Sequence, residues 1–133
     1  MSQPETNVHV RRSKLRRFFE TELRKTNKDL RGDGEYFFVR FSPHMVDRLT
    51  DRNICEHDTL RLINKLCSVR SEVLDFLKME NRPMRLELTD GVYWLGMTVD
   101  AIEETGFWGL TCRMIIKNRH RLQGKTSTHV IKV

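Results

Sequence analysis

A short segment at residues 42–48, SPHMVDR, combines residue types that can act on a phosphodiester. Ser42 is a preferred helix N-cap and Pro43 suits the first helical position, so this pair predicts a helix that begins here. His44 would lie in the first turn and Arg48 four residues later on the same face, so that both point into one pocket. The positive end of the helix dipole disfavours an imidazolium, so we expect a neutral His44, the form that a general base requires. Arg48 would hold a phosphate oxygen, although a surface histidine and a surface arginine are the commoner explanation of such a pattern.

Cleavage of RNA without a metal ion needs a base for the 2′-hydroxyl proton, an acid for the departing 5′-oxygen, and cations for the charge on phosphorus. Further side chains that could transfer a proton are His9, His57, His120, His129, Glu20 and Glu22. Each is a weak signal alone, because a histidine is most often an ordinary surface residue and a glutamate among arginines is usually a solvated ion pair.

Basic residues form two clusters in a chain whose 24 lysines and arginines outnumber 18 acidic residues and give a net charge of +6. Such clusters indicate a polyanion partner, although a charge run alone is as often a solvated surface. Trp94 and Trp108 could stack on the bases of single-stranded RNA, but Trp94 lies in a run typical of sheet packing. The predicted nucleic-acid-binding residues are Arg11, Arg12, Lys14, Arg16 and Arg17 in the first cluster, and Arg113, Lys117, Arg119, His120, Arg121 and Lys125 in the second.

Three cysteines, Cys55, Cys67 and Cys112, are an odd number without a C-x-x-C spacing, which fits neither a disulfide framework nor a zinc site. We therefore expect a reducing cytoplasm and no metal ion. The sequence lacks nucleotide-binding, zinc-protease and serine-hydrolase motifs, so we expect no cofactor. It also lacks the apolar core of a signal peptide and a stretch apolar enough for a membrane span, so we expect no export and no membrane partner.

The elements that would position these residues begin with a helix. Apolar residues recur at helical spacing over about residues 12–31, before two glycines, and predict a first helix with a basic outer face. The aromatic and β-branched run at residues 36–41 predicts a short strand. A short helix is expected at about residues 44–51. A third helix, the longest, is expected from residue 56 or 58 to about residue 79, along one apolar stripe.

Beyond Pro83 the apolar residues alternate instead, which is typical of strands. Strands are expected at residues 85–89, 92–99, 110–117 and 128–133, with a turn near Gly106 and a basic loop at 118–125. The first two of these strands flank Asp90-Gly91, a strong hairpin signal. The sequence therefore predicts an α+β fold with N-terminal helices packed on a C-terminal antiparallel β-sheet, in a single domain over residues 1–133.

Four segments of the sequence are long and unusual in composition. They are VRRSKLRR at residues 10–17 with Phe19-Glu20 following, SPHMVDR at 42–48, RLELTDG at 85–91 with Trp94-Leu95-Gly96, and Cys112-Arg113-Met114 through Arg121-Leu122 to Gly124-Lys125. In order and in composition these segments resemble the RegB family of early-mRNA endoribonucleases from T-even type bacteriophages. The resemblance covers nearly the whole chain.

The resemblance implies a fold akin to the RelE and YoeB toxins and a metal-independent endoribonuclease that uses histidines and leaves a 2′,3′-cyclic phosphate. Its substrate would be single-stranded early phage mRNA, cut in GGAG-type motifs of translation initiation regions in the cytoplasm of the host bacterium. The largest protein of the host's small ribosomal subunit is implied as a stimulating partner.

The resemblance also assigns roles to individual residues. His44 falls on one catalytic histidine of the family, Arg48 on the arginine one turn later, and Glu20 on the glutamate of the first helix. Asn64 stands where the family has its second catalytic histidine, and an amide cannot donate a proton as an imidazolium does. The departure leaves the second proton-transfer group open.

Two histidines are candidates for that group. His57 lies two helical turns before Asn64 and on almost the same face, so its ring could project toward the pocket that His44 faces. His120 belongs to the basic loop and ranks second. The remaining possibilities are Glu20 acting with water and an enzyme left weak by Asn64. The alternative function, which Asn64 favours, is a non-cleaving RNA-binding translational repressor. A DNA-binding regulator would need a helix-turn-helix pattern that the basic helices lack.

Overall fold

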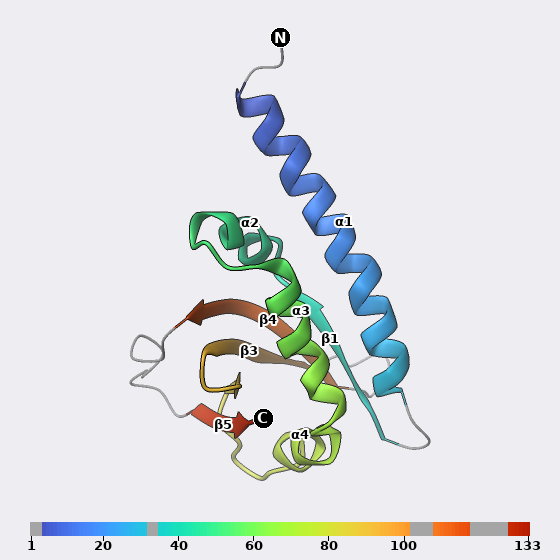
Figure 1. Cartoon of the computed structure of the whole chain (residues 1–133). Helices are drawn as coiled ribbons and strands as arrows, with labels where there is room; N and C mark the ends of the chain where they lie inside the picture. Colours follow the sequence, from blue (N-terminus) through green and yellow to red (C-terminus); the bar gives the residue numbers. More distant parts are fainter. Residues whose placement is uncertain (1–3, 32–34, 102–107, 118–127) are drawn as a thin grey trace.

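The first helix, α1 (Pro4–Leu30), spans 27 residues and runs along one side of the molecule (Figure 1). The computed structural model describes residues 4–31, 35–101, 108–117 and 128–133. Phe19, Leu23 and Leu30 are buried on the inner face of α1. The helix begins earlier than predicted, because the polar residues 4–7 carry no apolar stripe that could have indicated it.

Strand β1 (Phe37–Phe41) leads directly into α2 (Pro43–Asp51), as the sequence predicted. Ser42 has the extended backbone of an N-cap, although its side chain makes no capping hydrogen bond. The Ser42 backbone N–H instead donates to the carbonyl of Cys112 at 2.9 Å, which prolongs the pairing of β1 with the neighbouring strand up to the start of α2.

The region predicted as one long third helix is broken into three parts. These are α3 (Glu56–Asn64), the 3₁₀ turn η1 (Lys65–Cys67) and α4 (Arg70–Leu77). The prediction of a single longest helix is wrong, since Val69 has a φ of −117° and a ψ of 26°, outside the helical region. The apolar stripe continues through the break, where Leu66 is fully buried, so the hydrophobic pattern gave no sign of it.

In the described residues, five strands form one mixed sheet in the order β1-β4-β3-β2-β5. The last four strands are β2 (Arg85–Thr89), β3 (Tyr93–Ala101), β4 (Trp108–Lys117) and β5 (Thr128–Lys132). Strands β2, β3 and β4 are antiparallel, whereas β1 pairs with β4 and β5 pairs with β2 in parallel. The α+β class is confirmed. The sheet is not purely antiparallel, because β1, from the N-terminal half, joins one edge and β5 joins the other.

The turn between β2 and β3 has the chemistry that its sequence predicted. Asp90 Oδ1 accepts hydrogen bonds from the backbone N–H groups of Val92 at 2.9 Å and Tyr93 at 2.8 Å. Gly91 has a φ of +94°, a conformation that glycine adopts without steric cost.

The two faces of the sheet have different environments. Side chains such as Val39, Met97 and Leu110 share one hydrophobic core with residues of the helices. The opposite face carries a small apolar cluster in which Trp94 and Ile116 are buried. Trp94 is only 7% exposed, so it packs on the sheet and offers no free ring face for an RNA base. In the parts of the chain that the structure describes, no helix is both long and apolar enough to span a membrane.

Candidate active site

One side of helix α2 is buried, and His44 lies on the exposed side. Met45, Val46 and Leu49 pack into the core. This burial fixes the rotation of the helix about its axis and leaves His44 and Arg48 exposed.

His44 and Arg48 line one small hollow of about 90 Å³ between α2 and β4, as predicted. Arg52, one turn beyond Arg48, and Arg113 of β4 line it too. The described residues that line this hollow include three arginines and one histidine, and none of them is acidic. A phosphate group matches this charge, because arginine pairs its N–H donors with phosphate oxygens. The sequence analysis missed Arg52. It lies four residues after Arg48, the same spacing that placed Arg48 on one face with His44.

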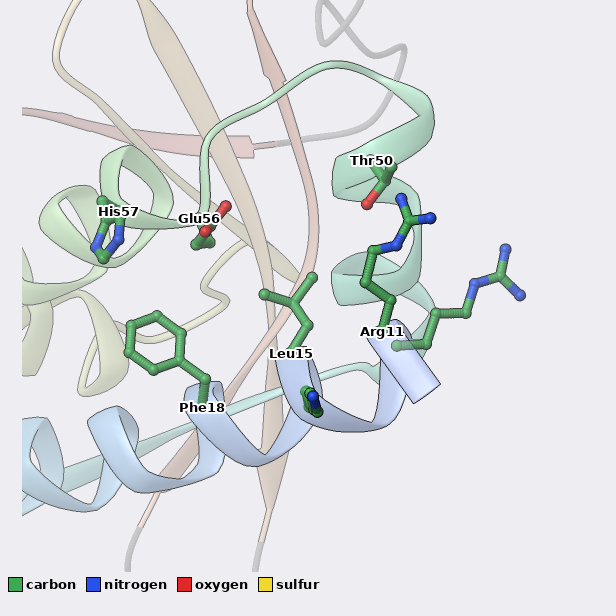
Figure 2. Close-up of a pocket in the computed structure, with 8 residues that line it drawn as sticks. Arg11, Leu15, Phe18, Thr50, Glu56 and His57 are labelled. Atoms are coloured by element: carbon green, nitrogen blue, oxygen red, sulfur yellow. The ribbon is translucent and has the colours of Figure 1, made fainter. Parts of the chain in front are cut away.

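His57 does not line the hollow that His44 lines. It lies at the start of α3 and borders two other hollows between α1 and α3, whose described linings share no residue with that of His44. Its ring packs edge-on against Phe18 of α1, with centroids 5.6 Å apart and planes at 72° (Figure 2). The sequence predicted that His57 and His44 converge on one pocket, and the structure separates them. A role of His57 in proton transfer stays a prediction.

Asn64 lies at the end of α3 and contacts α1. Its side-chain amide forms a hydrogen bond with the buried hydroxyl of Thr26. Asn64 and His57 border the same hollow, together with Glu22, so the predicted shared face of α3 is confirmed. Asn64, which the resemblance places at the family's second histidine position, therefore joins two helices.

Arg113 is the extra residue of a β-bulge in β4. Gly96 of β3 pairs with Met114 and Met97 pairs with Cys112, so Arg113 stands between the two pairs. A bulge redirects the side chain of the inserted residue. Sequence patterns do not mark this bulge, because it is defined by pairing between strands.

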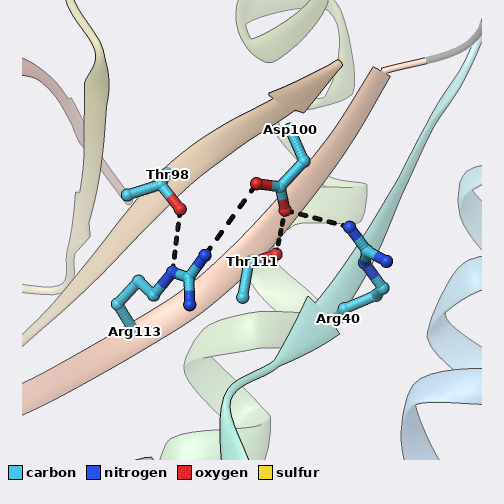
Figure 3. A network of polar contacts seen from close by, with 5 residues as sticks. All are labelled: Arg40, Thr98, Asp100, Thr111 and Arg113. Carbon is cyan, nitrogen blue, oxygen red and sulfur yellow. Dashed lines mark hydrogen bonds and ion pairs between the residues drawn. The ribbon is translucent and has the colours of Figure 1, made fainter. Parts of the chain in front are cut away.

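A polar network on the outer face of the sheet holds the Arg113 side chain (Figure 3). Arg113 Nε donates to Thr98 Oγ1 at 3.0 Å, and its guanidinium lies 3.9 Å from Asp100. Asp100 also accepts a hydrogen bond from the Thr111 hydroxyl and pairs with Arg40 at 3.0 Å. Asp100 therefore bridges three strands and orients Arg113, a role that the sequence analysis did not identify.

The pair Arg16–Asp47 fixes α2 against α1. Arg16 Nε donates to Asp47 at 3.0 Å and its Nη2 donates to the second carboxylate oxygen. The hydrogen bond from Arg16 holds the pKa of Asp47 below its usual range; burial opposes this effect, and the charges of Arg16, Arg12 and His44 reinforce it. Arg16 was predicted to bind nucleic acid, but in this structure its guanidinium binds Asp47.

The remaining predicted residues are dispersed. Glu20 is exposed on α1, outside the hollow that His44 lines. His129 stacks on Phe76, with centroids 5.0 Å apart. Of the residues predicted to bind RNA, Arg11, Lys14, Arg17 and Lys117 are exposed. Arg12 and Trp108 are half-buried. Gly106 and the basic-loop residues Arg119, His120, Arg121 and Lys125 lie outside the described residues.

Among the described residues, no three His, Cys, Asp or Glu side chains lie close enough together to bind a metal ion. The cysteines are separate free thiols. Burial raises the pKa of the Cys112 thiol to about 12, so this group is neutral and unsuited to nucleophilic attack.

An α+β domain in which a histidine and three arginines line one hollow defines a candidate site for a phosphodiester. The family model of the T4-phage endoribonuclease RegB matches residues 4–132. The chain therefore belongs to the RegB family. It is 40% identical over 147 residues to endoribonuclease RegB of Enterobacteria phage T4, covering 96% of each sequence. The solution structure of the phage T4 endoribonuclease RegB matches with a TM-score of 0.64 and 36% identity, over 95% of each chain. These findings confirm the family resemblance.

Proposed function

We propose that this chain is an endoribonuclease that cleaves single-stranded mRNA without a metal ion and that His44 is a catalytic residue. The observation that carries the proposal is the hollow in which His44 lies with Arg48, Arg52 and Arg113. Three cations bordering one imidazole suit the binding of a phosphodiester beside a general base. Membership of the RegB family supports the endoribonuclease class.

In this mechanism His44 takes the proton of the 2′-hydroxyl, and the 2′-oxygen attacks the adjacent phosphorus. Arg48, Arg52 and Arg113 stabilise the charge that develops on the non-bridging oxygens. The bond from phosphorus to the 5′-oxygen then breaks. The products are a 2′,3′-cyclic phosphate and a 5′-hydroxyl end.

The departing 5′-oxygen needs a proton, and Asn64 cannot supply it as an imidazolium would. His57, His120 and Glu20 stay predictions for this role. His57 and Glu20 lie outside the hollow that His44 lines. Replacing each in turn and recording kcat against pH identifies the donor, because its loss removes one limb of the pH profile.

The proposed substrates are early phage transcripts cut in GGAG-type motifs of translation initiation regions. Cleavage would take place in the cytoplasm of the host bacterium, with stimulation by the largest protein of its small ribosomal subunit. The phage T4 relative supports the phage setting.

Incubation of the purified chain with an end-labelled RNA that contains a GGAG motif, in EDTA, tests the proposal. We expect cleavage within the motif and product ends that carry a 2′,3′-cyclic phosphate. Strict dependence on a divalent ion, or 3′-hydroxyl product ends, would contradict the proposed chemistry.

The alternative function is a non-cleaving RNA-binding repressor, and the observation in its favour is Asn64 at the family's second histidine position. The same incubation separates the two. A repressor would retain the labelled RNA in a complex and leave its length unchanged.

A further inference from the structure

A larger hollow, separate from the one that His44 lines, lies where α1, the end of α2 and the start of α3 meet. Its volume is about 470 Å³, within the usual range of small-ligand sites. Figure 2 shows Leu15 and Phe18 of α1 on one side, with Glu56 and His57 of α3 facing them. Thr50 brings the end of α2 to the same hollow, so α2 contributes to this hollow and to the one that His44 lines.

The floor of this hollow is apolar and partly aromatic. Leu15 and Phe18 are half-buried and pack against the hydrophobic core. The ring of His57 meets Phe18 edge-to-face, and both residues line the hollow (Figure 2). A flat aromatic ligand suits such a floor, since bases of single-stranded RNA stack on aromatic side chains.

The rim of the hollow is cationic and comes from one helix. Arg11, Arg12 and Lys14 of α1 line it. A ligand that joins a flat aromatic ring to anionic groups would place its ring on the floor and its charges at this rim. A nucleotide within an RNA strand has this chemistry.

Glu56 is the one acidic residue among the described residues that line this hollow. It is half-buried, and within the part of the chain that the structure describes its carboxylate has no hydrogen bond and no ion pair. Its two oxygens are therefore available as a pair of acceptors.

We infer that this hollow binds a guanine base of the RNA substrate, with Glu56 accepting the two adjacent N–H donors of its Watson–Crick edge. Guanine presents N1–H beside its 2-amino group. Adenine and cytosine each place an acceptor nitrogen beside their amino group, and uracil places carbonyls beside its single N–H, so a carboxylate is repelled by one neighbour in each case. The inference rests on the proposed function, because it requires an RNA substrate.

The test compares binding of two RNA strands by the full chain. One strand contains GGAG, and in the other inosine, which lacks only the 2-amino group, replaces a single guanine of that motif, at each of its three positions in turn. Both are 2′-O-methylated so that neither is cleaved. We expect inosine at one position to lower the affinity about tenfold. Glu56→Gln should abolish that difference, because the N–H₂ group of the glutamine would face one of the two N–H donors of guanine.

Two further variants complete the test. Glu72→Gln, an exposed acid in the first turn of α4, removes an equivalent charge outside the hollow and should retain the tenfold preference. Phe18→Leu keeps an apolar floor without the ring and should weaken binding of both strands by at least about fivefold. Circular dichroism melts verify that each variant is folded.

Loss of the guanine preference in Glu56→Gln alone supports the site. A wild-type chain that binds both strands equally, or a Glu56→Gln variant that keeps the preference, overturns it. Unmethylated RNA is assayed in parallel for cleavage. Cleavage without guanine preference rejects the base site and keeps the nuclease, whereas guanine preference without cleavage rejects the nuclease and keeps the base site.

Discussion

The imidazole of His44 carries the proposed proton transfer, so its removal should affect the rate far more than binding. We expect His44→Ala to lower kcat by about 100-fold to 10,000-fold, the usual contribution of general base catalysis. RNA affinity and thermal stability should stay near wild type, because the side chain is exposed. His9→Ala, which removes an exposed histidine of α1, is the control. A normal rate in His44→Ala would exclude it as the base.

Arg113 depends on Asp100 for its orientation, and this dependence is testable. We expect Asp100→Asn to lower kcat by up to about tenfold, since Thr98 still binds the guanidinium. Arg113→Ala should lower it further, and the double variant should be no worse than Arg113→Ala alone. Additive losses in the double variant would show that Asp100 acts independently of Arg113.

The three thiols should react at rates set by their burial. Cys55 is exposed, Cys67 is half-buried and Cys112 is buried. Burial raises the pKa of Cys67 and Cys112, which lowers their thiolate content further. With a disulfide reagent we expect Cys55 to react first and Cys112 to react on unfolding. Rapid modification of Cys112 in the native protein would contradict its burial.

The residues of the site differ in how far the sequence reveals them. His44 and Arg48 are four residues apart on one helix, so local spacing was enough to pair them. Arg113 joins them only through the packing of α2 on β4 and through a bulge. His57 was assigned to the wrong hollow because helical spacing gives the face of a helix but not what that face packs against.

At the scale of elements, the Arg16–Asp47 pair should make stability depend on pH. The pKa of Asp47 is lowered from its ordinary value of 3.8, so the pair stabilises the fold above pH 3.8 and this stabilisation is lost as the pH falls through the lower, folded pKa. The Arg16 side chain is 42% exposed, so solvent screens the pair and limits its contribution to about 1 kcal/mol.

Denaturant unfolding at several pH values tests this dependence. Asp47→Asn should be less stable than wild type at pH 7, and the difference should shrink as the pH falls below about 4. Asp75→Asn, at an exposed position of α4, is the control and should show no such convergence. A constant difference at all pH values would mean that Asp47 stabilises the fold without its charge.

Local elements followed from the sequence where a local signal exists. The β2–β3 hairpin was predicted from Asp90-Gly91, and α2 from Ser42 and Pro43. The break between α3 and α4 has neither glycine nor proline to mark it. The parallel pairing of β1 with β4 joins segments far apart in the chain, and no local pattern encodes such a partnership.

At the scale of the whole molecule, the basic face of α1 should set the salt dependence of RNA binding. Each phosphate contact on a single strand contributes a slope of roughly −0.7 to the plot of log affinity against log salt concentration. Replacing the exposed Arg11, Lys14 and Arg17 by alanine should therefore flatten the slope by up to about 2. Arg24→Ala with Lys28→Ala, near the other end of α1, is the control. An unchanged slope would place the RNA elsewhere.

The pairing of β1 with β4 also determines when the active site can form during folding. Helix α2 follows β1 with Ser42 alone between them, and the Ser42 N–H donates to the Cys112 carbonyl. His44 and Arg113 therefore line one hollow only after these distant segments have met. Such long-range contacts form slowly, because a large loop must close first. During refolding from denaturant, the helical circular dichroism signal should therefore recover before RNA cleavage activity does. In the cell, partly folded chains would not yet cleave the cell's transcripts.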